Sequence, residues 1–261
     1  MTAIAQEWPA PAPGAAPLPR MVGAQAGLEL RTLLRNGEQL LLTLIIPVLL
    51  LGAFSKEDLV SYGPGSRIDF LAPGILALAV MSTAFTSQAI ATGFERRYGV
   101  LKRLGATPLS RRGLIAAKTL TVLAVEVLQS AVIVVVALAL GWHPRGGAAA
   151  ALWAVLLMVA GTAAFSGLAL LMAGTLRAEA TLAAANLVYL VMLGIGGVVF
   201  SLAKFPAGAQ PVLRLLPAGA LSDGLRSVLQ HGSGLPAKDL VVLALWAAAG
   251  IAVTARVFRW E

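Results

Sequence analysis

The sequence predicts an all-α membrane protein with six transmembrane helices, an N-terminal interfacial amphipathic helix, and short broken extracellular helices between spans five and six. The chain has 261 residues, of which 58% are hydrophobic and 12% are charged, whereas a soluble domain is about 25% charged. Its mean hydropathy is +0.84. Six segments are apolar over roughly the 20 residues that a spanning helix needs. We therefore expect most of the chain to lie in a lipid membrane.

The first 20 residues are rich in Ala and Pro and lack the basic and apolar regions of a signal peptide. We expect them to form a disordered cytoplasmic tail, followed by a single six-span domain over residues 21–261. The segment from Met21 to Asn36 predicts an amphipathic helix, because leucines recur on one face and charged residues lie around them. Such a helix lies in the membrane interface and leads into the first span.

The six predicted spans are Glu38 to Phe54, Asp69 to Gly93, Leu114 to Leu140, Gly147 to Gly174, Leu182 to Leu202, and Leu240 to Val257. With this assignment, thirteen Lys and Arg residues fall on the side of the two termini and seven on the other side. The positive-inside rule then places both termini in the cytoplasm. Arg outnumbers Lys fifteen to five and Ala is abundant, which is typical of a GC-rich bacterial genome. We therefore expect a multi-pass protein of a bacterial plasma (inner) membrane.

The segment from Ala203 to Pro236 is too polar to span a membrane and too apolar for an ordinary loop. Four prolines divide it into short pieces, and Pro217 to Gln230 predicts one amphipathic helix. Its apolar side consists of Leu221, Leu225, Val228 and Leu229. Two interpretations are open: short helices that dip back into the outer leaflet against protein, or an extracellular loop with one surface helix.

Several classes of protein are excluded by composition. The chain has no cysteine and two histidines that lie far apart, so we expect no disulfide and no metal site. The net charge of +8 does not indicate nucleic-acid binding, because the basic residues lie in loops where membrane topology places them. A P-loop, G-x-x-x-x-G-K-[ST], is also missing: Lys118-Thr119 is the only Lys followed by Ser or Thr, and Ala117 precedes it. We predict no ATPase site and no cofactor in this chain.

The densest basic cluster, six of the twenty Lys and Arg residues, lies between Arg96 and Arg112. Apolar residues recur there at helical spacing, which predicts a helix over about 94–105, and Gly105 is a natural stop. Thr107-Pro108 then predicts the start of the next helix. The apolar side of this helix consists of Phe94, Tyr98, Leu101 and Leu104. Such a helix can lie on lipid head groups or insert into a groove of a partner protein, and both interpretations are open.

Glu95-Arg96-Arg97-Tyr98-Gly99-Val100-Leu101-Lys102-Arg103-Leu104, then Thr107-Pro108-Leu109-Ser110 and Ala117-Lys118, resembles the loop between spans two and three of ABC-2 type transporter permeases. Two weaker likenesses occur along the chain in the same order as in the family. Leu34-Arg35-Asn36-Gly37-Glu38-Gln39-Leu40 resembles the start of the family's first span, and Leu216-Pro217 with Leu221-Ser222-Asp223-Gly224-Leu225-Arg226 resembles its last extracellular segment. The family usually has a bulkier residue in place of Ala218 or Gly219, which makes the last likeness looser.

The resemblance implies a permease subunit of an ATP-driven exporter of an amphipathic drug, natural product or lipid. It implies a homodimer or heterodimer of permeases, with Mg-ATP bound on two separate ATPase subunits. The basic helix would be the coupling element, with Phe94, Tyr98, Leu101 and Leu104 buried in the ATPase. The charged residues around this helix would pair with charges on the rim of the ATPase groove; they are Glu95, Arg96, Arg97 and Arg103. Arg177 and Glu179, in the short loop from Thr175 to Thr181, would make a minor cytoplasmic contact.

Spans two and five carry polar side chains at helical spacing: Thr83, Thr86 and Ser87 in the former, Asn186 and Tyr189 in the latter. One interpretation is a polar face on the substrate path, since spans two and five approach the dimer axis in the resembled family. The other is hydrogen bonding between helices with small-residue packing.

Glu126 is the only acid predicted near mid-bilayer. A charged side chain there costs about 2.5–3.5 kcal/mol on the insertion scale, so it should face protein or water, or be protonated. It predicts either a proton-coupled secondary transporter, an alternative to ATP-driven export, or a hydrogen-bonded acid that joins helices. The sequence shows no basic residue at a similar depth to pair with it.

Overall fold

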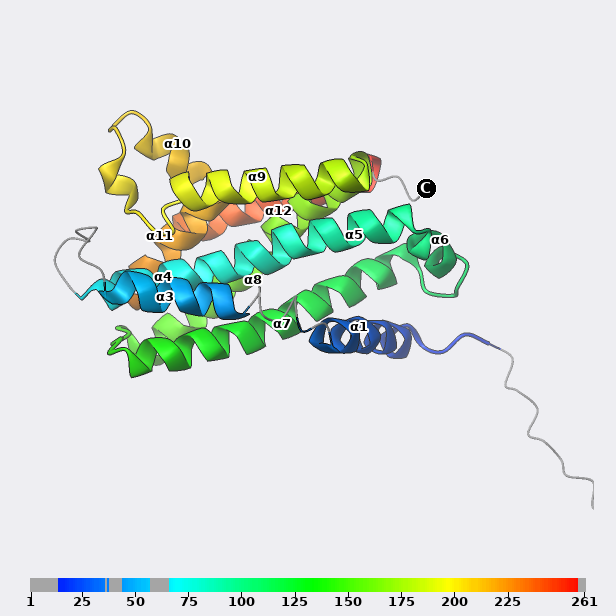
Figure 1. Cartoon of the computed structure of the whole chain (residues 1–261), viewed down its shortest axis with the longest axis horizontal. Coiled ribbons are helices and arrows are strands. Elements are labelled where there is room, and N and C mark those ends of the chain that lie inside the picture. Colours follow the sequence, from blue (N-terminus) through cyan, green and yellow to red (C-terminus); the bar gives the residue numbers. More distant parts are fainter. Residues whose placement is uncertain (1–13, 36, 38–43, 57–65, 258–261) are drawn as a thin grey trace, which may run out of the picture.

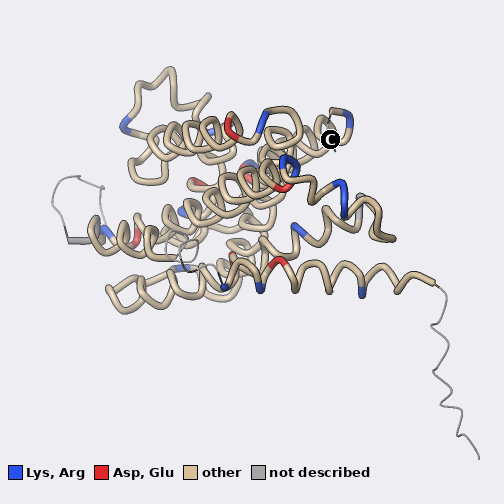
Figure 2. Tube along the Cα trace, turned by 45° about the vertical axis from the view of Figure 1, so that its right-hand side comes forward, with Lys and Arg blue, Asp and Glu red and all other residues tan. Residues whose placement is uncertain are grey.

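The computed structural model describes residues 14–35, 37, 44–56 and 66–257. Within these ranges the chain forms helices joined by turns, without a strand. The long helices run side by side along one axis, with α6 (Val100–Gly105) at one end and α10 (Gln210–Leu215) at the other (Figure 1). We call these the α6 end and the α10 end. Figure 2 shows most Lys and Arg residues near turns and helix ends, separated by long uncharged stretches.

Among the described residues, five helical segments are long and apolar enough to span a membrane. They are Arg67–Arg97, Gly113–Ala139, Gly147–Thr175, Ala178–Ile195 and Ala237–Val257. The corresponding elements are α4 (Arg67–Val80), the π-helix η2 (Met81–Ser87) and α5 (Gln88–Arg97), then α7 (Arg111–Ala139), α8 (Gly147–Thr175), α9 (Ala178–Ile195) and α12 (Ala237–Val257). The all-helical class is thus confirmed, and five of the six predicted spans coincide with helices that are long and apolar enough to span a membrane.

The predicted first span, Glu38 to Phe54, lies partly outside the described residues. Its described part belongs to α3 (Ile46–Lys56), a helix of 11 residues that packs against α4 and α7. This is shorter than the roughly 20 residues of a spanning helix, so the six-span count is not established by the described helices.

The predicted end of span five, at Leu202, is wrong. Helix α9 ends at Ile195, and Gly197 follows with φ of +72°. This left-handed conformation turns the chain at the α10 end. The turn leads into the 3-10 helix η3 (Leu202–Lys204), so the residues after Ile195 belong to the connection.

The core of the bundle is the continuous helix formed by α4, η2 and α5. Its α4 segment is apolar all around, and almost every residue in it is buried. Such a helix needs neighbours on every side, and α3, α7, α8, α9 and α11 (Pro217–Leu229) surround it. The π-helical turn at its centre, Met81–Ser87, contains four hydroxyl residues. Turns of this kind often occur at functional positions.

The predicted single helix over 94–105 is broken in the structure. Helix α5 ends at Arg97, Gly99 adopts a left-handed φ of +68°, and α6 begins at Val100. The helical spacing of the apolar residues continues through the break, so periodicity does not reveal it. The predicted stop is confirmed, because α6 ends at Gly105.

The next helix does not begin at Thr107-Pro108, as the sequence suggested. Ser110 is the N-cap of α7, and its hydroxyl accepts a hydrogen bond from the Gly113 amide at 3.1 Å. Serine in this position satisfies an amide that has no partner within the helix. Thr107 instead donates its hydroxyl proton to the carbonyl of Leu104, at 2.6 Å.

Helix α11 confirms the helix predicted from Pro217, and its predicted apolar side is buried. It packs between α4, α8 and α12, so the prediction of a surface helix in an ordinary loop is wrong. Arg226 on α11 is also buried. Its guanidinium donates to the carbonyls of Phe70 at 3.2 Å and Val198 at 2.7 Å, and its centre lies 3.8 Å from the centroid of the Phe70 ring. Burial lowers the pKa of Arg226 to about 10, which leaves it cationic at neutral pH.

Helices α8 and α12 pack closely against each other through two glycines. A Cβ atom placed on Gly250 would lie 3.0 Å from the carbonyl carbon of Gly167. Beside them, Thr254 donates its hydroxyl proton to the carbonyl of Gly167 at 3.1 Å. Small residues at membrane helix contacts allow this approach of two backbones.

The segment predicted to form an amphipathic helix before the first span forms α1 (Leu18–Arg35). It packs along α7, where Thr121 donates its hydroxyl proton to the carbonyl of Ala26 at 3.3 Å. The side of α1 that faces α7 carries Glu29 toward Lys118.

Candidate functional site

The α6 end is formed by the last turn of α5, helix α6, the start of α7 and the turn between α8 and α9 (Figure 1). Tyr98 projects from it and is 63% exposed. Its ring stacks on Phe94 with centroids 6.1 Å apart, and the Arg97 guanidinium lies 5.8 Å from its centroid. An exposed aromatic ring beside a cation is a combination enriched at protein interfaces.

Leu101, predicted to insert into a partner, lies inside the chain and is 1% exposed. The break at Gly99 gives α6 a direction of its own, and Leu101 faces the interior. Leu104 is partly buried and Phe94 is half-buried. The four apolar residues therefore do not form one exposed stripe, and Tyr98 is the one large apolar residue of the set that is freely exposed.

The charged residues of the predicted coupling segment bind other parts of the same chain. Arg97 forms an ion pair with Glu179, and Arg96 donates to the carbonyl of Leu176 at 2.6 Å. Arg103 folds back and donates to the carbonyl of Tyr98 at 3.0 Å. The turn after α5 and the turn before α9 are thus joined into one surface.

Arg177 lies exposed at the N-cap position of α9, in the second of these turns. Its carbonyl accepts hydrogen bonds from the amide and the hydroxyl of Thr181, at 2.8 and 3.0 Å. These two hydrogen bonds hold the backbone of Arg177 in place, and its exposed side chain belongs to the surface of the α6 end.

Lys118 joins three helices just inside the α6 end. Its ammonium nitrogen lies 2.6 Å from a carboxylate oxygen of Glu95 on α5 and 3.5 Å from one of Glu29 on α1. Lys118 is buried, as a charge can be when it is paired. The family resemblance implies that Glu95 pairs with a charge on the rim of the ATPase, whereas in the structure Glu95 pairs with Lys118.

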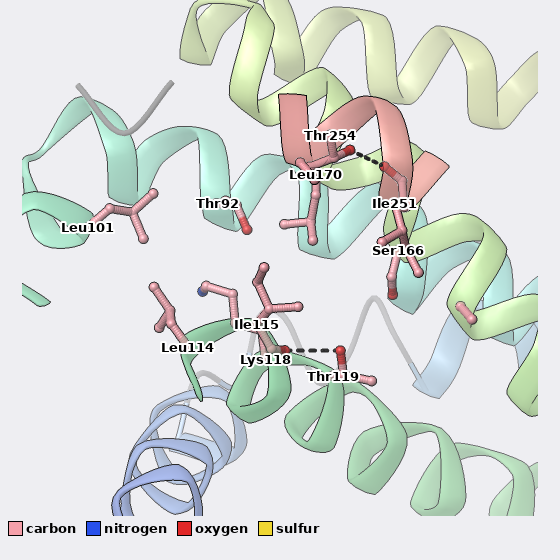
Figure 3. Close-up of a pocket in the computed structure, with 13 residues that line it drawn as sticks. Thr92, Leu101, Leu114, Ile115, Lys118, Thr119, Ser166, Leu170, Ile251 and Thr254 are labelled. Carbon is pink, nitrogen blue, oxygen red and sulfur yellow. Dashed lines mark hydrogen bonds between the residues drawn. The ribbon is translucent and has the colours of Figure 1, made fainter. Parts of the chain in front are cut away.

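A cavity of about 350 Å³ opens beside Lys118, between α5, α6, α7, α8 and α12. Figure 3 shows side chains from these helices pointing toward a common space, among them Thr92, Ile115 and Ile251. The lining is mostly apolar. The hydroxyls of Thr92 and Ser166 are buried there without a hydrogen-bond partner among the described residues.

The predicted substrate-path residues are only partly brought together. Thr83 and Ser87 line a second cavity, between α1, α5 and α7. Thr83 also donates to the side-chain oxygen of Gln129 on α7, at 2.9 Å. On α9, by contrast, Asn186 is exposed and Tyr189 is half-buried.

Thr86, the remaining predicted path residue, lies in η2 with its hydroxyl buried and unpartnered within the described part of the chain. The predicted polar face is therefore real only along η2 and its continuation into α5. The bond from Thr83 to another helix is of the kind that the second interpretation expects, whereas a role of Ser87 and its neighbours in a substrate path stays a prediction.

Glu126 is 3% exposed, and its carboxylate accepts a hydrogen bond from the hydroxyl of Thr162 on α8 at 2.6 Å. This contact joins α7 to α8 and supports the interpretation of an acid that holds helices together. The other carboxylate oxygen is buried without a partner in the described structure. Among the described residues, no group of His, Cys, Asp and Glu could hold a metal ion.

Sequence reasoning missed three of these groups: the cation Lys118 between two acids, the buried guanidinium of Arg226, and the buried amide of Gln88 on α5. Lys118 stands in an otherwise apolar stretch, a signal that points to burial but not to a partner. Arg226 follows Ser222 and Asp223 in a more polar segment, where the sequence gives no such signal.

The model of a protein family described as ABC-2 type transporter matches residues 28–229, which contain α4 to α11 and all residues of the α6 end. Among curated proteins, none matches the chain.

Proposed function

The chain belongs to the ABC-2 type transporter family, and on that premise we propose that it is one of two permease subunits of an exporter driven by separate ATPase subunits. The family makes it a membrane permease component of an ABC transporter. The second permease subunit is this chain or a similar one. The proposed cargo is amphipathic: a drug, a natural product or a lipid.

The observation that carries the proposal is the joining of two turns at the α6 end by Arg96 and Arg97, which bind Leu176 and Glu179. A partner that docks there touches the ends of α5, α7 and α9 at once. We place this end in the cytoplasm, because the basic cluster between Arg96 and Arg112 obeys the positive-inside rule there. Tyr98, with Phe94 and Arg97, is the proposed anchor in the ATPase.

Motion of the α6 end would be passed directly to the bundle core. Helix α5 continues through η2 into α4 without a loop, and this continuous helix contacts α3, α7, α8, α9 and α11. A shift of the docked partner would therefore move the core helix as a rigid rod. Switching between two packings of the same helices is a common transport device.

The cargo class is supported by the cavity of about 350 Å³ at the α6 end. It has the size of a small-molecule site, and its walls are apolar with a few hydroxyls and Lys118. This lining suits a molecule with a large apolar part and a small polar one.

The proton-coupled alternative rests on Glu126. Its unpartnered carboxylate oxygen is the observation in its favour. Family membership and the bond to Thr162 favour ATP-driven transport with a helix-joining Glu126.

The test is purification of the tagged chain in mild detergent, with mass spectrometry of the proteins that accompany it. We expect a stoichiometric chain with a P-loop. Tyr98→Asp should remove most of it, whereas Phe200→Asp, which changes an exposed aromatic residue after α9, should retain it. Purification of a permease dimer without an ATPase would overturn the proposal. Leu101→Asp is unsuitable for this test, because it would place a charge in the chain's own core and confuse docking with folding.

A further inference from the structure

A second cavity, of about 300 Å³, lies between α1, α5 and α7. We call it the α1 groove. It borders the cavity of Figure 3, because Thr92 and Lys118 line both. Its walls include Leu28 and Leu33 of α1 and Val122 of α7, while its polar groups come from α1, η2, α5 and α7.

The charged groups of the α1 groove do not balance. The described residues that line it carry two carboxylates, Glu29 and Glu95, and one ammonium, Lys118. Lys118 lies 2.6 Å from Glu95 and 3.5 Å from Glu29, and Gln25 donates to the same oxygen of Glu29 at 2.9 Å. Lys118 is thus already engaged by both acids, and the groove keeps an excess of one negative charge. A surface of this kind attracts a cation more than an anion.

Two buried polar side chains in the groove have unmet hydrogen bonds. Gln88 is 6% exposed, and neither its amide nitrogen nor its amide oxygen has a partner among the described residues. The Thr92 hydroxyl is also buried and unpartnered there. Each buried unmade bond costs about 1–3 kcal/mol. Buried polar groups without hydrogen-bond partners at a cavity wall indicate a ligand whose polar atoms complete these bonds.

We propose that the α1 groove binds an amphipathic organic cation. Its charged group lies near Glu29 and Glu95, its polar atoms reach Gln88 and Thr92, and its apolar part lies against the leucines and valines of the walls. As a statement about cargo this rests on the proposed transport function; binding itself needs neither ATP nor the ATPase. An anionic lipid head group suits the groove less well, because Lys118 is the single cation in its described lining and both acids oppose an anion.

The proposal is tested by fluorescence polarisation of tetramethylrhodamine ethyl ester, a lipophilic cation, with the purified full chain in detergent. Sulforhodamine B, which has the same ring system and a net negative charge, is the matched probe. We expect the cation to bind and the anion to bind at least tenfold more weakly. Glu29→Gln keeps the shape of the side chain and removes one charge. Because a charge-assisted contact contributes about 1.5–3 kcal/mol, it should weaken cation binding about tenfold or more.

Asp223→Asn is the control, since it removes a carboxylate on α11, away from the groove, and it should bind the cation like the unmodified chain. Gln88→Leu supplies a second variant without a change of charge and should also weaken binding. Equal binding of both probes, stronger binding of the anion, or unchanged cation binding in Glu29→Gln would overturn the proposal. Mass spectrometry of the same preparation separates the two claims: an ATPase without cation binding rejects the groove alone, and cation binding without an ATPase rejects ATP-driven transport alone.

Discussion

The ammonium nitrogen of Lys118 lies 2.6 Å from a carboxylate oxygen of Glu95, and this ion pair joins α7 to α5 where the core helix reaches the α6 end. Glu29 of α1 lies 3.5 Å from the same nitrogen. The pair also stands between two cavities, since Lys118 lines both. One buried cation therefore fixes the positions of α1, α5 and α7 at the surface where we place the ATPase.

Lys118→Met should destabilise the chain. It removes the cation and leaves Glu95 as a largely buried charge without its partner, which costs up to about 3–5 kcal/mol in a fully buried pair and less here because Glu95 keeps some exposure. Thermal unfolding of the purified protein should show a lower Tm. Lys238→Met, at an exposed position of α12, is the matched control, and equal Tm values for the two variants would contradict this account.

Gly250→Ala should separate α8 from α12. The new Cβ atom would meet the backbone of Gly167 and Leu168 at 3.0–3.3 Å, and overpacking of this kind costs about 1–3 kcal/mol. Gly194→Ala in α9 is the control, because nothing lies within 4 Å of its Cβ position. There the better helix propensity of Ala should stabilise the chain by up to about 1 kcal/mol. Denaturation of both variants checks the prediction, which fails if Gly250→Ala is as stable as Gly194→Ala.

Glu126→Gln should retain ATP-dependent transport. The glutamine side chain keeps an oxygen that can accept the hydrogen bond of Thr162, so the contact between α7 and α8 survives without a titratable group. Glu126→Leu loses that bond but leaves the Thr162 hydroxyl its other acceptor, the carbonyl of Met158 at 2.8 Å, so it should lower stability by about 0.5–1.5 kcal/mol. Transport into membrane vesicles measures the first effect, and its loss in Glu126→Gln would favour the proton-coupled alternative.

The membrane orientation can be read with single cysteines, because the chain has none of its own. Val212→Cys lies exposed on α10, and Lys102→Cys lies exposed on α6. A membrane-impermeant maleimide should label position 212 in intact cells and position 102 only after permeabilisation. The opposite pattern would place the α6 end outside the cell and remove the ATPase from the account.

Hydropathy alone located five of the spans and the helix from Pro217, because long apolar runs and helical spacing reflect local properties of the sequence. It did not reveal the break at Gly99, because the spacing of Phe94 and Leu101 continues through it and only the backbone conformation differs. The inward position of Leu101 follows from that break. Lys118 and Glu95 are separated by 23 positions, and their pairing depends on how α5 packs against α7, which a single sequence does not specify.

The most direct test of the central claim, that an ATPase docks on the α6 end, is photo-crosslinking from one position. Benzoylphenylalanine replaces Tyr98 in one variant and Phe200 in the other, both being exposed aromatic residues. After illumination of cells, the account predicts a covalent adduct between position 98 and a chain that carries a P-loop, and none from position 200. An absence of such an adduct at position 98, in a protein that still forms its permease dimer, would contradict the account.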